Sequence, residues 1–333
     1  MPYPQSAPTG LGQVAQQAAQ VLYQHRLVST RQLHRLVTPH HTRSEFLRRQ
    51  LHTLRQAGFA EAVGRRSTGQ TELLWWLTEK GAQAVEAVGL LQSRAYRMSP
   101  EAALGPLQEH TLAVVDSGAA FVEHARRLGH ECGPLDWSPE IAHYYRDESR
   151  PGEELCLVPD AVLSYVHTAG KQRTLLTFFV EVDRTQMTIA RLAQKLHAYA
   201  AYHEYAPQPQ MTKGTRGPRR QVALPAWRYR YPAFPRLLLV LTGASEDRLA
   251  RRIADLRSLA ASDPALATTA LRAGVTTLDQ LRNRGPFQPI FTPVLGAAEP
   301  VDAWIRGPSL PQPEHPLGAG TPTRPAALRK RTA

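Results

Sequence analysis

Cysteine is scarce in this chain of 333 residues, which has only Cys132 and Cys156. Neither cysteine belongs to a CxxC pair or to a Cys/His spacing of the kind that binds zinc, so we expect no zinc finger or zinc ribbon. Two cysteines in a chain of this length also argue against a disulfide framework. The cysteine content therefore favours a reducing compartment, and we expect a cytoplasmic protein.

Long apolar runs are also missing. No run approaches the eighteen or so apolar residues that a membrane-spanning helix needs, so no membrane partner is expected. Residues 1–10 lack a basic region followed by an apolar core, so they do not resemble a signal peptide.

Several enzyme motifs are absent as well. The sequence has no P-loop, GxGxxG or GxSxG motif, which removes support for an ATPase, a dehydrogenase or an α/β-hydrolase. It has no His-x-His pair of the kind that a paired-histidine relaxase uses. Tyr199 and Tyr202 have helical spacing, and we expect them to be core or groove residues rather than nucleophiles.

Lysine is rare, whereas positive charge is abundant. The chain has 40 Lys and Arg residues against 28 Asp and Glu, and its formal net charge is +12 with a pI of about 10.1. This balance favours a polyanionic partner, of which nucleic acid is the commonest. The alternative is a basic protein with no nucleic-acid role.

By pattern and composition the chain divides into two main segments, 11–90 (the first segment) and 107–306 (the second segment), with a linker between them and a tail after them. Residues 11–90 combine helical patterns with a hairpin, and 91–106 are predicted to be a linker because of two Xaa-Pro breakers. Residues 107–306 have the pattern of a mixed α/β domain that contains a polar, basic loop at 207–221. Residues 307–333 form a proline-rich basic tail that we expect to be disordered.

The first segment predicts three helices. The first spans 11–25, the second is capped by Ser29 or Thr30 and runs to Val37, and the third runs to Ala57. Thr42 is the predicted cap of the third helix, with Glu45 completing a capping box. Leucines at i, i+4 and i+7 give this helix a buried face: Leu47, Leu51 and Leu54.

The opposite face of the third helix is basic. Arg48, His52 and Arg55 repeat the same spacing, with Arg43 and Arg49 beside them. A helix that buries leucine and presents arginine is typical of a recognition helix in the major groove of double-stranded DNA. An ordinary solvated basic face is the open alternative.

A hairpin follows the third helix. Residues 59–63 and 72–77 are predicted strands, joined by a tip that carries Arg65 and Arg66, and Thr78 caps a further helix. Three helices followed by such a hairpin indicate a winged-helix domain, whose wing contacts phosphates. Some winged helices bind proteins instead, and a palindromic DNA target would require a homodimer, so both points stay open.

The second segment contains a set of acidic residues. Residues 107–128 are a predicted helix in which His110 is expected to pack in the core. Residues 155–166 are a predicted strand with Asp160, and 174–184 are a second strand with Glu181 and Asp183 near its end. A helix over 186–205, a buried strand over 235–242 and a helix capped by Ser245 follow.

These acids share one end of the predicted hairpin. Glu181 and Asp183 lie two residues apart and share a face, and Asp160 is on the neighbouring strand. Carboxylates that meet in this way repel one another unless a cation compensates, and Mg²⁺ prefers such oxygen ligands. A nearby lysine can stabilise charge that develops on a phosphate.

The pattern Pro159-Asp160, then Glu181-Val182-Asp183, then a helix resembles the PD-(D/E)xK nuclease-like superfamily. The resemblance implies Asp160 and Glu181 as metal ligands and a catalytic lysine two residues later. In this chain Asp183 stands at that position, and Lys195 on the following helix is the candidate replacement. The pattern of the first segment and this resemblance together predict an α/β (α+β) fold, with a winged helix followed by a mixed-sheet nuclease-like domain.

More narrowly, the chain resembles the replication-relaxation family. The motifs are WWLTEKG after the hairpin, EHTLAV at the start of the second segment, and PDAVLSY, FFVEVDRTQM and LAQKLHAYAAY in order. The resemblance implies plasmid or mobile-element DNA as the target, in replication or mobilisation, with proteins of those processes as partners.

Three functions remain open. The chain is a Mg²⁺-dependent nicking nuclease that uses Asp160, Glu181, Asp183 and Lys195, or a non-catalytic transcriptional or copy-number regulator with a degenerate nuclease fold, or a protein-interaction module of a replication complex. For the acids, the structural alternative is an ion-pair network at a strand end.

Overall fold

The computed structural model describes residues 11–67, 70–147, 152–207 and 223–306. Within these residues it has ten α-helices, a three-stranded antiparallel sheet and a six-stranded mixed sheet. The predicted mixed α/β class is therefore confirmed. The predicted tail at 307–333 and nearly all of the basic loop at 207–221 lie outside the described residues.

The first segment begins with three helices: α1 (Gln13–His25), α2 (Thr30–Val37) and α3 (Glu45–Gln56). Ser29 caps α2 in a capping box with Gln32. The predicted capping box of α3 is wrong, because α3 begins three residues after Thr42 and its N-cap residue makes no side-chain cap. The His41 ring stacks on Phe46 across this turn, with centroids 5.1 Å apart.

A three-stranded sheet follows, in the order β1-β3-β2. β1 (Val28–Ser29) pairs with β3 (Gln70–Leu77), and β2 (Ala60–Ser67) pairs with β3 from Ala60↔Leu77 to Ser67↔Gln70. Both hairpin strands are longer than predicted, because the polar residues next to the tip continue the ladder. Thr78 caps α4 (Glu79–Ala87), as predicted.

The segment predicted as a linker has structure of its own. It contains the short helix α5 (Pro100–Ala103), which Ser99 caps. Before α5, Arg94 donates to the carbonyl oxygen of Gln24 at 2.7 Å, and Arg97 forms an ion pair with Glu86. These bonds fix residues 94–97 against α1 and α4.

The second segment is built on a six-stranded sheet in the order β11-β10-β9-β8-β7-β4. The neighbours β8, β9 and β10 are parallel, and the remaining pairs are antiparallel. The strands are β4 (Trp137–Pro139), β7 (Ala161–Ala169), β8 (Gln172–Asp183), β9 (Arg236–Leu241), β10 (Ala273–Thr277) and β11 (Thr292–Pro293).

The single strand predicted over 155–166 is wrong. Residues Leu155–Leu157 form β6, which pairs with β5 (His143–Tyr145) outside the main sheet, and β7 starts only at Ala161. Pro159 lies in the gap, and a proline cannot donate to a ladder hydrogen bond. The interruption leaves Asp160 immediately before β7 rather than within a strand.

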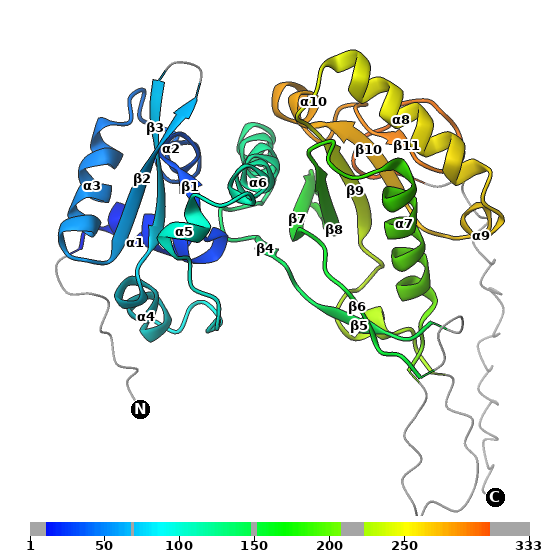
Figure 1. The fold of residues 1–333 in the computed structure, drawn as a ribbon, viewed down its shortest axis with the longest axis horizontal. Coiled ribbons are helices and arrows are strands. Elements are labelled where there is room, and N and C mark those ends of the chain that lie inside the picture. Colours follow the sequence, from blue (N-terminus) through cyan, green and yellow to red (C-terminus); the bar gives the residue numbers. More distant parts are fainter. Residues whose placement is uncertain (1–10, 68–69, 148–151, 208–222, 307–333) are drawn as a thin grey trace, which may run out of the picture.

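Helices cover both faces of the large sheet (Figure 1). α7 (Ile189–Glu204) and α8 (Glu246–Ala261) lie on the face of Phe179, Glu181 and Asp183. α6 (Gln108–Leu128) and α10 (Leu278–Arg284) lie on the face of Phe178 and Val180. The short helices η1 (Ala226–Tyr229) and α9 (Pro264–Ala267) complete this segment.

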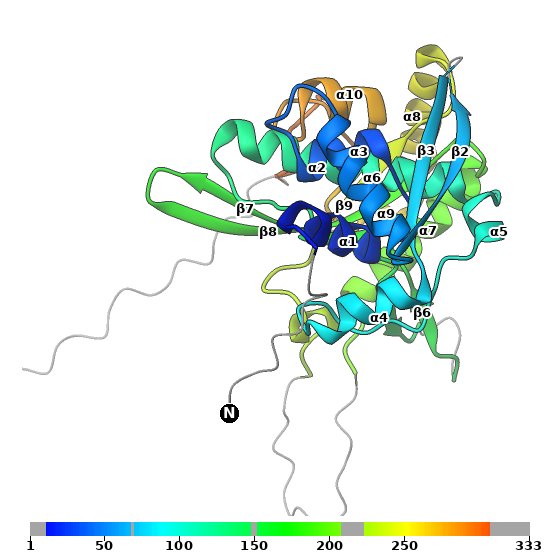
Figure 2. The same ribbon diagram turned by 90° about the vertical axis from the view of Figure 1, so that its left-hand side faces the viewer.

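α6 joins the two segments. It packs on the sheet with one side and on α2 and β1 with another, so one apolar core runs through both segments. Gly118 permits the close approach of Trp137, whose ring atoms would lie 2.4 Å from any added Cβ. α3 lies on the outer side of this arrangement, whereas the end of α1 contacts β4 (Figures 1 and 2). None of the described helices combines the length and apolarity that crossing a membrane requires.

Candidate functional site

The basic face of α3 is open to solvent. Leu47, Leu51 and Leu54 are fully buried beneath it, as their spacing predicted. The five residues predicted on the opposite side and in the preceding turn are all exposed: Arg43, Arg48, Arg49, His52 and Arg55. Since α2 and not α3 packs against α6, the second segment does not cover this face.

The two hairpin arginines differ. Arg66 is exposed, whereas the guanidinium of Arg65 forms a bidentate ion pair with Glu109 in the first turn of α6 at 2.8–2.9 Å. Arg65 therefore ties the hairpin to α6, and only Arg66 presents an unpaired cation there. The residue pattern did not indicate this difference, because Glu109 lies 44 residues from Arg65.

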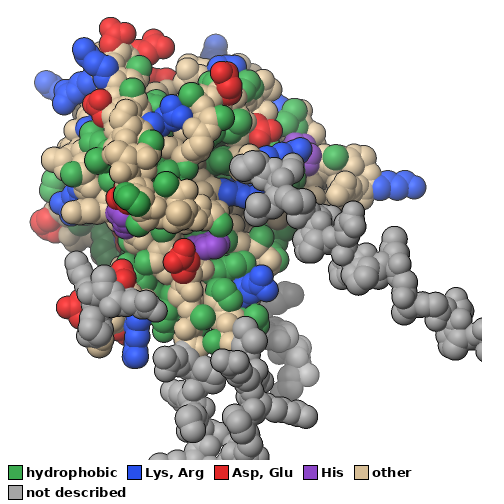
Figure 3. All heavy atoms as spheres, turned by 90° about the vertical axis from the view of Figure 1, so that its right-hand side faces the viewer, with side chains coloured by type: hydrophobic (Ala, Val, Ile, Leu, Met, Phe, Trp, Pro, Cys, Tyr) green, Lys and Arg blue, Asp and Glu red, His purple; other side chains and the backbone are tan. Residues whose placement is uncertain are grey.

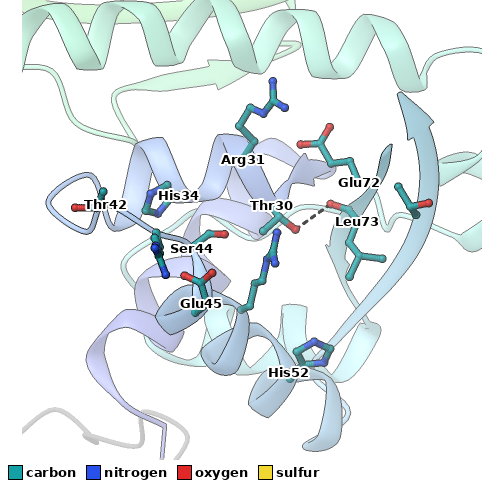
Figure 4. A pocket seen from close by; sticks show the side chains of 12 residues that line it. Thr30, Arg31, His34, Thr42, Ser44, Glu45, His52, Glu72 and Leu73 are labelled. Atoms are coloured by element: carbon teal, nitrogen blue, oxygen red, sulfur yellow. Dashed lines mark hydrogen bonds between the residues drawn. The ribbon is translucent and has the colours of Figure 1, made fainter. Parts of the chain in front are cut away.

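A groove lies between α2, the start of α3 and β3 (Figure 4). Its volume is about 600 Å³. At its base the hydroxyl of Thr30 donates to the carbonyl oxygen of Leu73 at 3.2 Å and joins α2 to β3. Arg31, which sequence reasoning missed, lines this groove beside Arg43 and Arg48, and Glu45 and Glu72 supply negative charge.

In the second segment the side chains of Glu181 and Lys195 lie in contact. The Lys195 ammonium lies 2.5 Å from one carboxylate oxygen of Glu181, and the Tyr199 hydroxyl donates to the other at 2.6 Å. The Glu181 side chain is only 2% exposed. Burial and the charge of Asp160 raise the pKa of Glu181 to about 7. Burial disfavours the Lys195 ammonium, but Glu181 and Asp160 raise its pKa overall.

Asp160 has a partner that the sequence did not indicate. The predicted core residue His110 is partly exposed, and its Nε2 lies 3.1 Å from Asp160. The backbone N–H of Val182 donates to the other carboxylate oxygen at 2.7 Å. The hydrogen bond between His110 and Asp160 raises the pKa of His110. Burial raises the pKa of Asp160, but the hydrogen bond and the charge of His110 outweigh burial, so the pKa of Asp160 is lowered overall.

Asp183 is engaged by a different helix. Arg252 of α8 lies 2.5 Å from one of its oxygens, and the backbone N–H groups of Gln186 and Met187 donate to the other. Both side chains of the ion pair are nearly buried. Asp183 is therefore neutralised by α8, whereas Lys195 of α7 neutralises Glu181.

A magnesium ion does not fit these residues in the arrangement that the structure shows. Every oxygen of the three carboxylates accepts a hydrogen bond from a named donor of the chain. Across the described residues, no three His, Cys, Asp or Glu side chains are grouped so as to hold a metal. A cation at Asp160 and Glu181 would have to displace His110 or Lys195.

Asp160, Glu181, Asp183 and the side chains that pair with them form an acidic cluster. Two successive residues of α6 connect the hairpin to this acidic cluster. Glu109 binds Arg65 of the hairpin, and His110 binds Asp160 of the cluster. His110, Tyr199 and Arg252 are the cluster residues that sequence reasoning did not assign to it. Only Tyr199 carried a usable signal, because it lies one helical turn after Lys195 on the same helix face.

No curated protein and no solved structure matches the chain. One family model does match, over residues 20–216, and it is described as replication-relaxation. The match covers more than half of the chain, begins within α1 and ends after α7, and includes the basic face of α3, the hairpin and the three acids Asp160, Glu181 and Asp183. The chain belongs to the replication-relaxation family, which suggests a role related to DNA replication or relaxation.

Proposed function

We propose that this chain binds double-stranded DNA through a winged-helix domain at residues 11–90. α3 serves as the recognition helix and the β2–β3 hairpin as the wing. The observation that carries the proposal is the exposed basic face of α3, which the second segment leaves uncovered. The proposed targets are plasmid or mobile-element DNA during replication or mobilisation, and the family membership supports a role related to DNA replication or relaxation.

The groove supports this proposal in detail. Its lining combines Arg31 of α2 with Arg43 of the turn before α3, so it offers two cations to a phosphate backbone that enters beside the recognition helix. Glu45 and Glu72 lie in the same groove and repel phosphate, so they restrict where the backbone can lie. The geometry thus favours a defined path over uniform attraction to any polyanion.

The test is duplex binding, measured by fluorescence anisotropy at several salt concentrations. Arg48→Ala/Arg49→Ala/Arg55→Ala should weaken binding and make the slope of log K against log salt shallower by about 2.7, or ~0.9 for each phosphate contact. The matched control is Arg248→Ala/Arg251→Ala on the exposed side of α8, which should bind as the wild type does. Equal binding by the triple variant and the wild type would refute the proposal and favour a protein-interaction module.

For the second segment we propose a non-catalytic role, as a degenerate nuclease-like fold. The saturated hydrogen bonding of Asp160, Glu181 and Asp183 supports it, because the chain's own donors already compensate the three charges. One observation favours the rival, a Mg²⁺-dependent nicking nuclease. Asp160, Glu181 and Lys195 converge from three different elements, and Lys195 remains partly exposed.

Supercoiled plasmid with Mg²⁺ separates these two functions. The non-catalytic role predicts no conversion to nicked circles by the wild type or by Asp160→Ala. The exposed acid Asp255 supplies a matched control, because Asp255→Ala should leave any genuine nicking intact. Nicking by the wild type and Asp255→Ala, but not by Asp160→Ala, would establish the nuclease and overturn the non-catalytic role.

A further inference from the structure

Three arginines meet at the end of the large sheet where β9 and β10 begin. Arg236 is the first residue of β9, Arg272 directly precedes β10, and Arg306 follows the last bridge of the described chain. The N–H of Leu237 donates to the carbonyl oxygen of Arg272 at 2.9 Å, so the backbones at Arg236 and Arg272 are adjacent. The acidic cluster includes residues at the other end of this sheet, where β8 terminates.

Trp304 contacts two of these arginines. The guanidinium carbons of Arg236 and Arg306 lie over its ring, 5.6 and 5.0 Å from the centroid. The Nε of Arg236 also donates to the carbonyl oxygen of Trp304 at 2.6 Å, and His167 of β7 packs edge-on against the indole. These contacts hold two cations against one aromatic ring.

These three arginines lack acidic partners of the kind that Arg35 and Arg252 have. In the described part of the chain none of the three arginines forms an ion pair with a carboxylate, and Asp302 is the acid whose charge acts on Arg236. Burial and the charges of Arg272 and Arg306 lower the pKa of Arg236 to about 10. Like charges that lie together repel one another and cost stability unless an opposite charge is present. A bound anion would supply that opposite charge to the three arginines.

We propose that Arg236, Arg272 and Arg306 form a second phosphate-binding site, which takes the sugar-phosphate backbone of a nucleic acid at a place separate from α3. Arg272 and Arg306 are exposed and can reach phosphate oxygens, whereas Arg236 is held by Trp304. Figure 3 shows Lys and Arg side chains and a His on the right-hand part of the face that it views.

The location gives this site a distinct role. α6 lies between α3 and the large sheet, at whose end the three arginines lie, so one duplex segment lying along α3 would leave this site free (Figure 1). The chain can thereby hold two DNA segments, or two parts of one bent molecule. The inference extends the proposed function, since it assumes that nucleic acid is the partner, but it does not depend on α3 as the recognition element.

The experiment uses Arg272→Gln/Arg306→Gln, both exposed positions whose exchange should leave the unfolding free energy within about 0.5 kcal/mol. Binding of a labelled duplex is measured in the wild type and in the background Arg48→Ala/Arg49→Ala/Arg55→Ala. In that background Arg272→Gln/Arg306→Gln should lower the residual affinity for the duplex about tenfold and make the salt slope shallower by about 1.8. Arg248→Gln/Arg251→Gln is the control and should do neither.

A bridging assay tests directly whether the chain holds two DNA duplexes at once. A duplex on beads should capture a free labelled duplex through the wild type, but not through either the α3 variant or the Arg272/Arg306 variant. If the Arg272/Arg306 variant bridges as well as the wild type and binds unchanged in the α3 background, the second site is refuted while the α3 proposal stands.

The source of the phosphate is tested with inorganic phosphate. Its titration is followed by tryptophan fluorescence, with Trp304→Phe identifying the signal of this site. The nucleic-acid site predicts that duplex competes with inorganic phosphate at Trp304. Saturation of the Trp304 signal by inorganic phosphate without competition from duplex would overturn the proposal in favour of a small-anion site.

Discussion

α3 and the acidic cluster use the same kinds of charged residue in opposite ways. On α3, Arg48, Arg49 and Arg55 are exposed, and the described residues offer them no acidic partner. In the cluster, Lys195 and Arg252 lie within 2.5 Å of Glu181 and Asp183, whose side chains are nearly buried. A cation on α3 is available to a polyanion, whereas a cation in the cluster is already engaged by the fold.

The net charge of +12 does not distinguish cations in buried ion pairs from exposed, unpaired cations. Buried ion pairs are expensive to break, because removal of one partner leaves a charge without compensation. Exposed unpaired arginines contribute little to folding but attract phosphate over several ångströms. Substitutions in the cluster should therefore alter stability, and substitutions on α3 should alter binding.

The largest effect is expected at the Arg252–Asp183 pair. Arg252→Met would leave the Asp183 carboxylate, only 3% exposed, without its cation, and should lower the free energy of unfolding by about 3–5 kcal/mol. Urea denaturation followed by circular dichroism measures this loss. Arg251→Met, an exposed neighbour on the same helix, should change it by less than about 0.5 kcal/mol. Equal stability of the two variants would contradict a structural role for the pair.

The pH dependence of stability should follow from Glu181 and His110. The pKa of Glu181 is raised to about 7, so the folded chain keeps a proton that the unfolded chain releases nearer pH 4.5. The raised pKa of His110 acts in the same direction, since its stabilisation is lost as pH rises through the folded pKa. The free energy of unfolding should thus fall by about 2 kcal/mol between pH 5 and pH 8.

Glu181→Gln isolates the larger contribution to this slope. The variant keeps the shape of the side chain but no longer titrates, so denaturation curves between pH 5 and pH 8 should become flatter. The pKa of Asp160 is lowered, so Asp160 does not change its protonation between pH 5 and pH 8 and should not contribute to the slope. An unchanged slope in Glu181→Gln would mean that Glu181 is ionised throughout.

An effect of smaller free energy is expected for a single α3 arginine. Arg48→Ala should weaken duplex binding about tenfold and make the salt slope shallower by ~0.9, because one phosphate contact is lost. Its unfolding free energy should equal that of the wild type within about 0.5 kcal/mol, measured by urea denaturation. A stability loss comparable to that of Arg252→Met would erase the contrast between the two regions.

The sequence predicts α3 well, since leucines at i, i+4 and i+7 define the buried face and place the arginines opposite it. Two-residue strands such as β1 and β11 have no measurable period, so their pairing depends on tertiary contacts. The same limit applies to the cluster. Asp160, Glu181 and Lys195 follow from local pattern, but His110 and Arg252 join them from 50 and 69 residues away, where packing alone sets the distance.

The smallest effect is expected at the ion pair between Arg65 and Glu109. Arg65 is a hairpin cation that Glu109 engages in a partly exposed pair, and such pairs stabilise by only about 0.2–1 kcal/mol. Glu109→Gln should release Arg65 toward phosphate and strengthen duplex binding about twofold to fivefold at low salt, measured by anisotropy. In Arg65→Gln/Glu109→Gln that gain should disappear, because it requires the arginine. A gain that persists in the double variant would mean that Glu109 repels DNA by itself, and that pairing does not decide which arginines bind.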